Sequence, residues 1–256
     1  MSSCIDGKKM EKPTKFTFSN GRIAQAVRVQ HIEELPAGLH ELGLHSGQPV
    51  LVLIGGASKM DTEAMNRVRA FFAQMLVPVV VALGGFVIDG GTDTGVMQLM
   101  GQARAITHGA FPLIGVAATG KVATPDMSTP PPRAAQLEPH HTHFVLVPGT
   151  SWGDESPWMS HVADVLSAGA NSVTVLVNGG KTAWEDVTQS VKAGRQVVVV
   201  GGSGRTADEL ASALRGETAD AGAKSLVSSE LLRAVDITSS YDELASVIEA
   251  ILSTKT

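Results

Sequence analysis

Four runs of β-branched and aliphatic residues in this chain each lead into a pair of glycines. The runs are 51–54, 86–88, 173–177 and 197–200, and the pairs are Gly55-Gly56, Gly90-Gly91, Gly179-Gly180 and Gly201-Gly202. Hydroxyl, Lys or Arg residues and then a helical pattern come after each pair, which predicts a repeated strand, tight turn and helix N-terminus. Glycine permits sharp turns and close approach of a ligand, and helix N-termini attract anions. Four such turns predict one phosphate-lined crevice at the C-terminal edge of a parallel sheet.

Strand-like and helix-like segments alternate along the chain, which predicts an α/β fold: a Rossmann-like, doubly wound, mainly parallel sheet flanked by helices. Residues 1–20 are polar and are predicted to form a flexible N-terminal leader, with a single domain over residues 21–256. Further strands are expected at 23–29, 113–116 and 144–147, and helices at 61–83 (split at Pro78), 93–107, 157–167, 182–193, 206–215 and 241–252. Residues 30–48 are interpreted as a linking region, 117–142 as a functional loop or lid, and the stretch after 215 as loose and polar.

The composition excludes several classes of function. A net charge of -5 argues against a nucleic-acid-binding surface, so an anionic ligand would have to be held by local groups. The single cysteine, Cys4, excludes a disulfide framework and a cysteine zinc site, and it fits a reducing cytoplasm. The uncharged stretch 71–88 is interpreted as a buried helix running into a strand, not as a membrane span, because Pro78 and Gly84-Gly85 interrupt it.

The loop of residues 90–96 is the most specific candidate for ligand binding. Thr92 and Thr94 supply hydroxyl groups beside the glycines, and these side chains also suit helix capping, as does that of Asp93. The preceding Asp89 is equally suited to a ribose hydroxyl and to the N–H groups of the turn itself. Ligand contact by the two threonines is the favoured interpretation.

Two later turns add cationic groups. Lys181 and Thr182 follow Gly179-Gly180, but Val175 stands where a phosphate-binding P-loop requires glycine, so no magnesium-dependent ATPase is indicated. Lys181 either contacts a phosphate or is simply solvated, and the sequence does not decide between these two interpretations. Arg205, after Gly202-Ser203-Gly204, is the first choice for clamping a phosphate or carboxylate, because its planar fork suits oxyanions.

Candidates for catalysis are few. Glu185 and Asp186 have the chemistry of a general acid or base, although acidic residues are also common in the first turn of a helix. The histidines at 140, 141 and 143 resemble a metal cluster but are interpreted as structural or hydrogen-bonding, and no metal site is expected. Tryptophans 152, 158 and 184 lie near glycine turns, where stacking on a base and packing are the alternatives.

Taken in order, these loops resemble the LSDAT family of the SLOG superfamily, bacterial relatives of the N-terminal region of TRPM cation channels. The resemblance runs over roughly residues 22–215. The matching segments are 54–57, 89–97, 115–122, 137–144 and 197–208.

The resemblance implies a Rossmann-like module that binds or senses a nucleotide-derived ligand, with ADP-ribose and its cyclic forms as the leading class and no other cofactor required. No pore-forming segment follows, so output is expected through a homo-oligomer, an effector protein or catalysis. The expected ligand-binding residues are Gly55, Gly56, Ala57, Lys59, Gly90, Gly91, Thr92, Thr94, Gly95, Gly149, Thr150, Gly179, Gly180, Lys181, Thr182, Gly202, Ser203, Gly204 and Arg205.

The alternative is a hydrolase that cleaves an N-glycosidic or pyrophosphate bond of such a ligand. Phosphoribohydrolases of the same superfamily resemble the pattern P-G-G-x-G-T-x-x-E at the turn equivalent to 178–180. This chain retains the two glycines there and has Asp186 in place of the final Glu. Glu185 or Asp186 would then act as the acid, and binding without turnover is the favoured reading.

Overall fold

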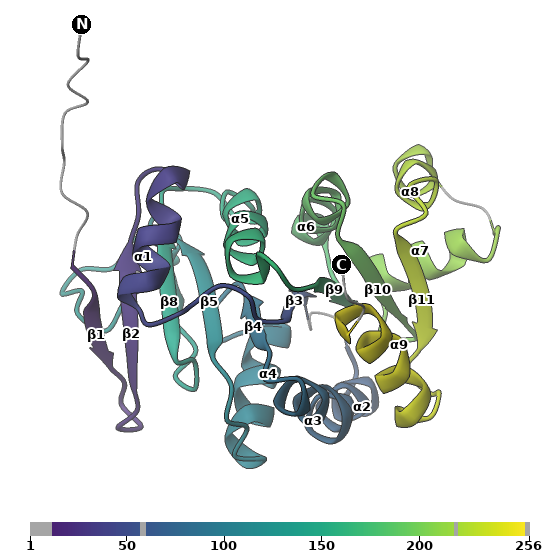
Figure 1. The fold of residues 1–256 in the computed structure, drawn as a ribbon, viewed down its shortest axis with the longest axis horizontal. Coiled ribbons are helices and arrows are strands. Elements are labelled where there is room, and N and C mark those ends of the chain that lie inside the picture. The colour runs from purple at the N-terminus through teal and green to yellow at the C-terminus, as the bar shows by residue number, and fades with distance from the viewer. Residues whose placement is uncertain (1–11, 57–59, 218–219, 254–256) are drawn as a thin grey trace, which may run out of the picture.

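The computed structural model of the chain describes residues 12–56, 60–217 and 220–253, and within these ranges a nine-stranded sheet carries helices on both faces (Figure 1). In spatial order the strands are β1 (Thr14–Thr17), β2 (Ile23–Arg28), β8 (His143–Val147), β5 (Leu113–Ala118), β4 (Phe86–Asp89), β3 (Val50–Gly55), β9 (Ser172–Val177), β10 (Gln196–Gly201) and β11 (Leu232–Asp236). Every neighbouring pair is parallel except β1 with β2. The predicted Rossmann-like, mainly parallel α/β fold is confirmed.

The direction of winding reverses at β3. From β3 the chain adds β4, β5 and β8 on one side, and it then returns to place β9, β10 and β11 on the other. Because parallel crossovers are right-handed, the connecting helices change face at the reversal. One face carries α2 (Thr62–Phe71), α3 (Val77–Ala82), α4 (Gly95–Ile106) and α9 (Tyr241–Ser253); the other carries α1 (Leu35–Glu41), α5 (Ser156–Ser167), α6 (Lys181–Lys192), α7 (Arg205–Leu214) and α8 (Ala221–Val227). The crevice of a doubly wound sheet opens at such a switch point, here between β3 and β9.

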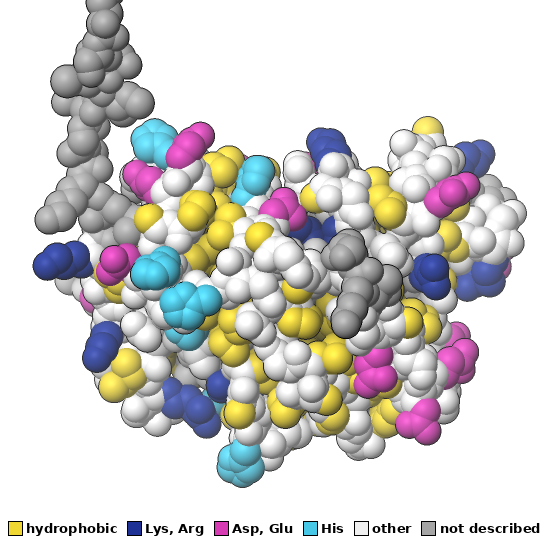
Figure 2. All heavy atoms as spheres, viewed as in Figure 1, with side chains coloured by type: hydrophobic (Ala, Val, Ile, Leu, Met, Phe, Trp, Pro, Cys, Tyr) yellow, Lys and Arg dark blue, Asp and Glu magenta, His cyan; other side chains and the backbone are white. Residues whose placement is uncertain are grey.

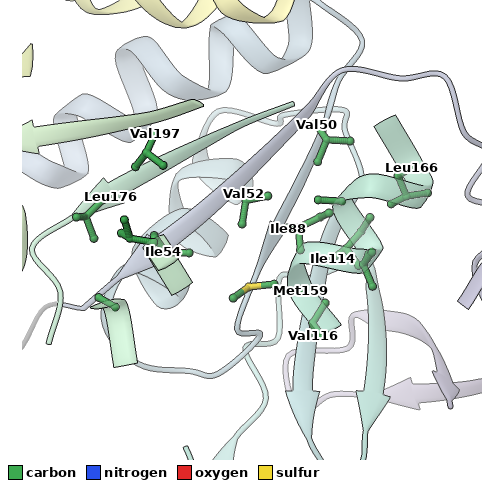
Figure 3. Close-up of a cluster of buried hydrophobic side chains, with 14 of the residues drawn as sticks. Val50, Val52, Ile54, Ile88, Ile114, Val116, Met159, Leu166, Leu176 and Val197 are labelled. Atoms are coloured by element: carbon green, nitrogen blue, oxygen red, sulfur yellow. The ribbon is translucent and has the colours of Figure 1, made fainter. Parts of the chain in front are cut away.

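Two hydrophobic layers form the core, one on each face of the sheet. Alternate residues of a strand point to opposite faces, so Val50, Val52 and Ile54 face α5, while Leu51 and Leu53 face the helices on the other side. Figure 3 shows the first layer, in which the strand side chains meet side chains of α5. Burial on both faces explains why the strands are continuous apolar runs rather than alternating ones.

The predicted helix at 61–83 is continuous, and its expected interruption takes the form of a π-helical turn at Phe72–Leu76 between α2 and α3. The backbone N–H of Val77 bonds back to the carbonyl of Phe72, five residues earlier, just before Pro78, which has no N–H to donate. By length and composition alone, Thr62–Ala82 is a candidate membrane span. In the structure its apolar side, including Phe71, packs on the sheet as core.

Three segments differ from the expectation. The predicted flexible leader is wrong at residues 14–17, which form β1 against β2. The linking region 30–48 contains a 3-10 turn (Ile32–Glu34) and α1. The stretch after 215 contains α8 and β11, and β11 was missed because it is an edge strand with mostly exposed side chains and no clear apolar alternation.

The long segment at 117–142 is tied to the turn that follows β4. It contains a short parallel pair, β6 (Val122–Ala123) with β7 (Ala135–Gln136). Beyond β7, Leu137 bridges to Thr92, the N–H of Asp93 bonds to the carbonyl of Gln136, and the N–H of Glu138 bonds to the carbonyl of Gly91. The segment therefore acts as a wall of the C-terminal edge.

We expect Gly55→Ala to destabilise the fold, by on the order of 1–3 kcal/mol or more. Gly55 has φ +136, and a β-carbon there would lie 1.9 Å from the carbonyl oxygen of Val177 on β9. The matched control is Gly56→Ala, since the nearest atom to a β-carbon at Gly56 is 3.8 Å away. Urea unfolding of both variants measures the difference; equal stabilities would show that the β3–β9 contact does not require glycine.

Candidate functional site

A cavity of about 260 Å³, called here the central pocket, lies at the C-terminal edge beside the switch point. The end of β3 and the turn after β4 form its base, and the first turns of α5 and α6 form its sides. Apolar contact comes from Ile54, Met97, Met159 and Trp152. Of the residues expected to bind ligand, it brings together Gly55, Gly90, Thr92, Thr94 and Thr182.

Two carboxyl groups face the central pocket. Burial raises the pKa of Asp186 to about 7; the hydroxyl of Ser156, which donates to Asp186 Oδ1 at 2.5 Å, opposes the rise, while the charges of Glu155 and Glu185 add to it. Burial also raises the pKa of Glu155. The pocket therefore contains a carboxyl group that changes its protonation near neutral pH, as acid–base chemistry requires.

A second, more open cavity of about 850 Å³, the outer groove, adjoins the central pocket at Trp152 and Thr182. It carries Lys181 and Arg205 together with Glu185, which is exposed and accepts a hydrogen bond from Gln189. The candidate acids are thus separated: Asp186 lines the central pocket and Glu185 lines the groove. The cations lie in the groove as well.

Four helices begin around these cavities without a side-chain cap. They are α4 after Thr94, α5 after Glu155, α6 after Gly180 and α7 after Gly204. In contrast, α2 and α8 are capped by Asp61 and Asp220. Uncapped N–H groups at a helix start are available to an anion.

The glycine turns divide into glycines required by packing and glycines that leave space. A β-carbon at Gly91 would lie 2.8 Å from the α-carbon of Gly115, and one at Gly179 would lie 2.9 Å from Ala183. At Gly90 and Gly56, no atom would come closer than 3.9 and 3.8 Å respectively. In the turns after β3 and β4, Gly55 and Gly91 are therefore required by close packing. Gly56 and Gly90 instead leave room next to the crevice.

The remaining expected residues take other positions. Ser203 is buried, donates to the carbonyl of Val200 and accepts from the N–H of Asn178. Gly149 packs against Asp154, whose carboxylate accepts the N–H of Thr150. A β-carbon at Gly180 would meet the Arg205 guanidinium at 3.0 Å, so this cation lies over the turn. The expected contacts at Ala57 and Lys59 lie outside the described residues.

Comparison with known proteins identifies the family. A family model described as SLOG in TRPM, prokaryote (LSDAT), matches residues 48–245. The chain belongs to this prokaryotic LSDAT family. The match covers the strands and helices that build the central pocket and the outer groove.

The LSDAT chain is also similar to part of several much longer channel proteins. Mouse transient receptor potential cation channel subfamily M member 2 is 25% identical over 237 residues, which cover 77% of this chain and 16% of that protein. A member-like 2 protein of Nematostella vectensis is 28% identical over 195 residues, covering 62% and 12%. The chain thus spans less than a fifth of the length of these relatives.

A buried hydrogen-bond chain fixes the turn after β4. The ring of His141 bonds to Asp89 at 2.8 Å and to Glu138 at 2.8 Å, and Asp89 also accepts the N–H of Gly91 at 2.7 Å. Burial alone would lower the pKa of His141, but the two carboxylates, Asp89 first, outweigh it and raise the pKa to about 9. Asp89 therefore organises the turn and His141 anchors it.

Among the described residues, no group of three or more acidic, His or Cys side chains is arranged to hold a metal ion.

Sequence reasoning missed three contributors to these sites. The sequence left open whether Trp152 stacks on a base or packs in the core. In the structure it lies half-exposed where the central pocket and the outer groove meet, with Lys121 Nζ 5.1 Å from the centre of its ring. Glu155 was not among the candidates that the sequence indicated, although it lines the central pocket. The acidic partners of His141 were not recognised, although the spacing of Glu138 and His141 would have indicated one of them.

We expect Asp186→Asn to change how stability depends on pH. A carboxyl whose folded pKa is near 7 binds a proton in the native state between about pH 4 and 7, while the unfolded chain does not, so wild-type stability falls as pH rises through this range. The asparagine of the variant cannot titrate. The free energy of unfolding of the variant should therefore rise relative to that of wild type across this range, by about 1.4 kcal/mol per pH unit.

Urea unfolding of both proteins between pH 4 and 8 measures this difference. Glu249→Gln serves as the control for the loss of an acidic group, since Glu249 is exposed on α9, which lies on the opposite face of the sheet from Asp186. Parallel curves for wild type and Asp186→Asn would contradict the raised pKa.

Proposed function

We propose that this chain is a cytoplasmic binding module for a nucleotide-derived ligand, with the nucleoside end in the central pocket and the phosphates in the outer groove. The separation of charge between the two cavities carries this proposal. Among the described residues, the central pocket is lined by Glu155 and Asp186 and by no Lys or Arg, whereas the adjoining groove carries Lys181 and Arg205. A phosphate is repelled by the first and attracted by the second.

The sizes of the cavities support the same orientation. Pockets that enclose a whole drug-sized ligand usually measure roughly 300–1,000 Å³, and the central pocket, at about 260 Å³, is smaller. It suits a base with its ribose, and Trp152 and Met159 offer apolar contact to the base. The rest of a larger ligand would extend into the groove.

The phosphates would be held by local groups. On the face shown in Figure 2, Lys and Arg side chains are spread among Asp and Glu rather than gathered in one patch. Lys181, Arg205 and the uncapped start of α6 supply the attraction in the groove. The ligand class that we propose is ADP-ribose and its relatives, and the response would pass through a homo-oligomer or an effector protein.

We expect Lys181→Ala and Arg205→Ala to weaken ADP-ribose binding about ten- to a hundredfold each, because each removes a charge-assisted contact to phosphate. Binding of adenosine, which has no phosphate, should change little. Arg233→Ala, at an exposed position on β11, is the control for loss of a positive charge. Isothermal titration measures the affinities; wild-type affinity for ADP-ribose in both variants would refute the assignment of the groove.

A separate variant addresses the central pocket. Gly90→Ala adds a methyl group at a position with no strained φ and no atom within 3.9 Å, so the fold should tolerate it while the pocket narrows. We expect affinity for both adenosine and ADP-ribose to fall, about tenfold. Gly222→Ala on α8 is the matched control, and unchanged affinity in Gly90→Ala would place the nucleoside elsewhere.

The position of Asp186 favours one second candidate, hydrolysis of an N-glycosidic bond. Its carboxyl, with a pKa near 7, would give its proton to the departing base as the bond to the sugar breaks. Water would then add its oxygen to the sugar carbon, and the proton that water releases would return to the Asp186 carboxylate. Incubation with NAD or AMP followed by chromatography tests this. Asp186→Asn should abolish turnover and keep binding, whereas Glu185→Gln should keep both. If the wild-type protein returns the nucleotide intact, hydrolysis is refuted and only the binding function remains.

A further inference from the structure

A third cavity, of about 300 Å³, lies between α2 and the turn that joins β10 to α7, and we call it the rim pocket. Asn178, at the end of β9, and Arg67, on α2, both line it. Asn178 is only 1% exposed, and its Oδ1 has no hydrogen-bond partner. The buried Nε of Arg67 also has none, although its Nη1 donates to Glu63. Two complementary groups, one acceptor and one donor, are therefore left unpaired at a single cavity.

The orientation of the Asn178 carboxamide is fixed by its neighbours. Its Nδ2 donates to the carbonyl of Ser203 at 2.9 Å, and its backbone N–H donates to the hydroxyl of the same residue at 2.7 Å. A flipped amide would set two oxygens against each other, so Oδ1 is the atom that stays without a donor. Leaving a buried acceptor unpaired costs stability, which a ligand that donates to it would recover.

The unpaired atoms specify the chemistry of that ligand. Oδ1 can only accept a hydrogen bond and Nε–H can only donate one, and the hydroxyl groups of a sugar do both. The lining gives an anion no net attraction, because Asp61 and Asp208 offset the charges of Arg67 and Arg205. Its described lining contains no aromatic side chain, so a base finds no stacking surface here. A sugar without a base matches this set of groups best.

We propose that the rim pocket binds the terminal ribose of an ADP-ribose-like ligand, with ribose hydroxyls paired to Asn178 Oδ1 and Arg67 Nε. This inference rests on the proposed function. Arg205 lines both the outer groove and the rim pocket, so a diphosphate in the groove leads to the ribose site. One ligand then spans three subsites: nucleoside, diphosphate and base-free ribose.

The test compares ADP-ribose with ADP, which lacks the terminal ribose, by isothermal titration. Wild type should bind ADP-ribose more tightly than ADP. Arg67→Met keeps the aliphatic stem and removes the donor, so it should weaken ADP-ribose binding about tenfold and leave ADP binding unchanged. Arg69→Met, on the exposed side of the same helix, is the matched control and should affect neither ligand.

Asn178→Gly provides a second variant, because glycine adopts the left-handed backbone that Asn178 has at φ +59. It removes Oδ1 and should also lower affinity for ADP-ribose only; thermal unfolding checks that it remains folded. Equal affinity of wild type for the two nucleotides, or an equal loss of both in Arg67→Met, overturns the ribose site.

The outcomes separate this inference from the proposed function. If Lys181→Ala, Arg205→Ala and Gly90→Ala have no effect while Arg67→Met selectively weakens ADP-ribose, the ribose site stands and the proposed path of the ligand fails. If the first three variants weaken binding and Arg67→Met does not, the proposed function stands and the ribose site fails. Absence of binding of both nucleotides to wild type refutes both.

Discussion

The pairing of β3 with β9 is the contact on which the rest of the structure depends. These strands lie far apart in the sequence, yet they pair from Val50 with Ser172 to Gly55 with Val177. At the last pair the backbones are so close that only glycine fits on β3. Beyond it, the segments that follow β3 and β9 lead to α2 and α6, which lie on opposite faces of the sheet. This divergence opens the crevice, and the central pocket and the rim pocket both lie along it.

The crevice is not uniformly suited to phosphate, although all its turns are rich in glycine. The turn after β4 is held by the buried Asp89 and faces a pocket with two further carboxyl groups, Glu155 and Asp186. The cations Lys181 and Arg205 lie on the turns after β9 and β10. In the proposed function, the position of the phosphates would therefore depend on which strand a turn follows, and the glycine pattern alone does not encode this difference between the turns.

The sequence was sufficient for the seven inner strands of the sheet, because continuous apolar runs and glycine turns are local signals. The edge strands β1 and β11 lack such a run and were not predicted. Gly90, Thr92 and Thr182 were expected from those same signals, and they line the central pocket. The paired function of Asp89 and His141 could not be read in this way, since their contact joins segments 52 residues apart. Nor could the unpaired Oδ1 of Asn178, because an absent partner is a property of the folded structure alone.

The pairing of β2 with β8 has a consequence for how the chain assembles. During synthesis β1 and β2 emerge first and can form their antiparallel hairpin at once, but the parallel partner of β2 is β8, whose residues 143–147 are translated after three other strands of the sheet. A two-stranded hairpin is marginally stable alone. One edge of β2 therefore stays without its parallel partner until β8 has been synthesised.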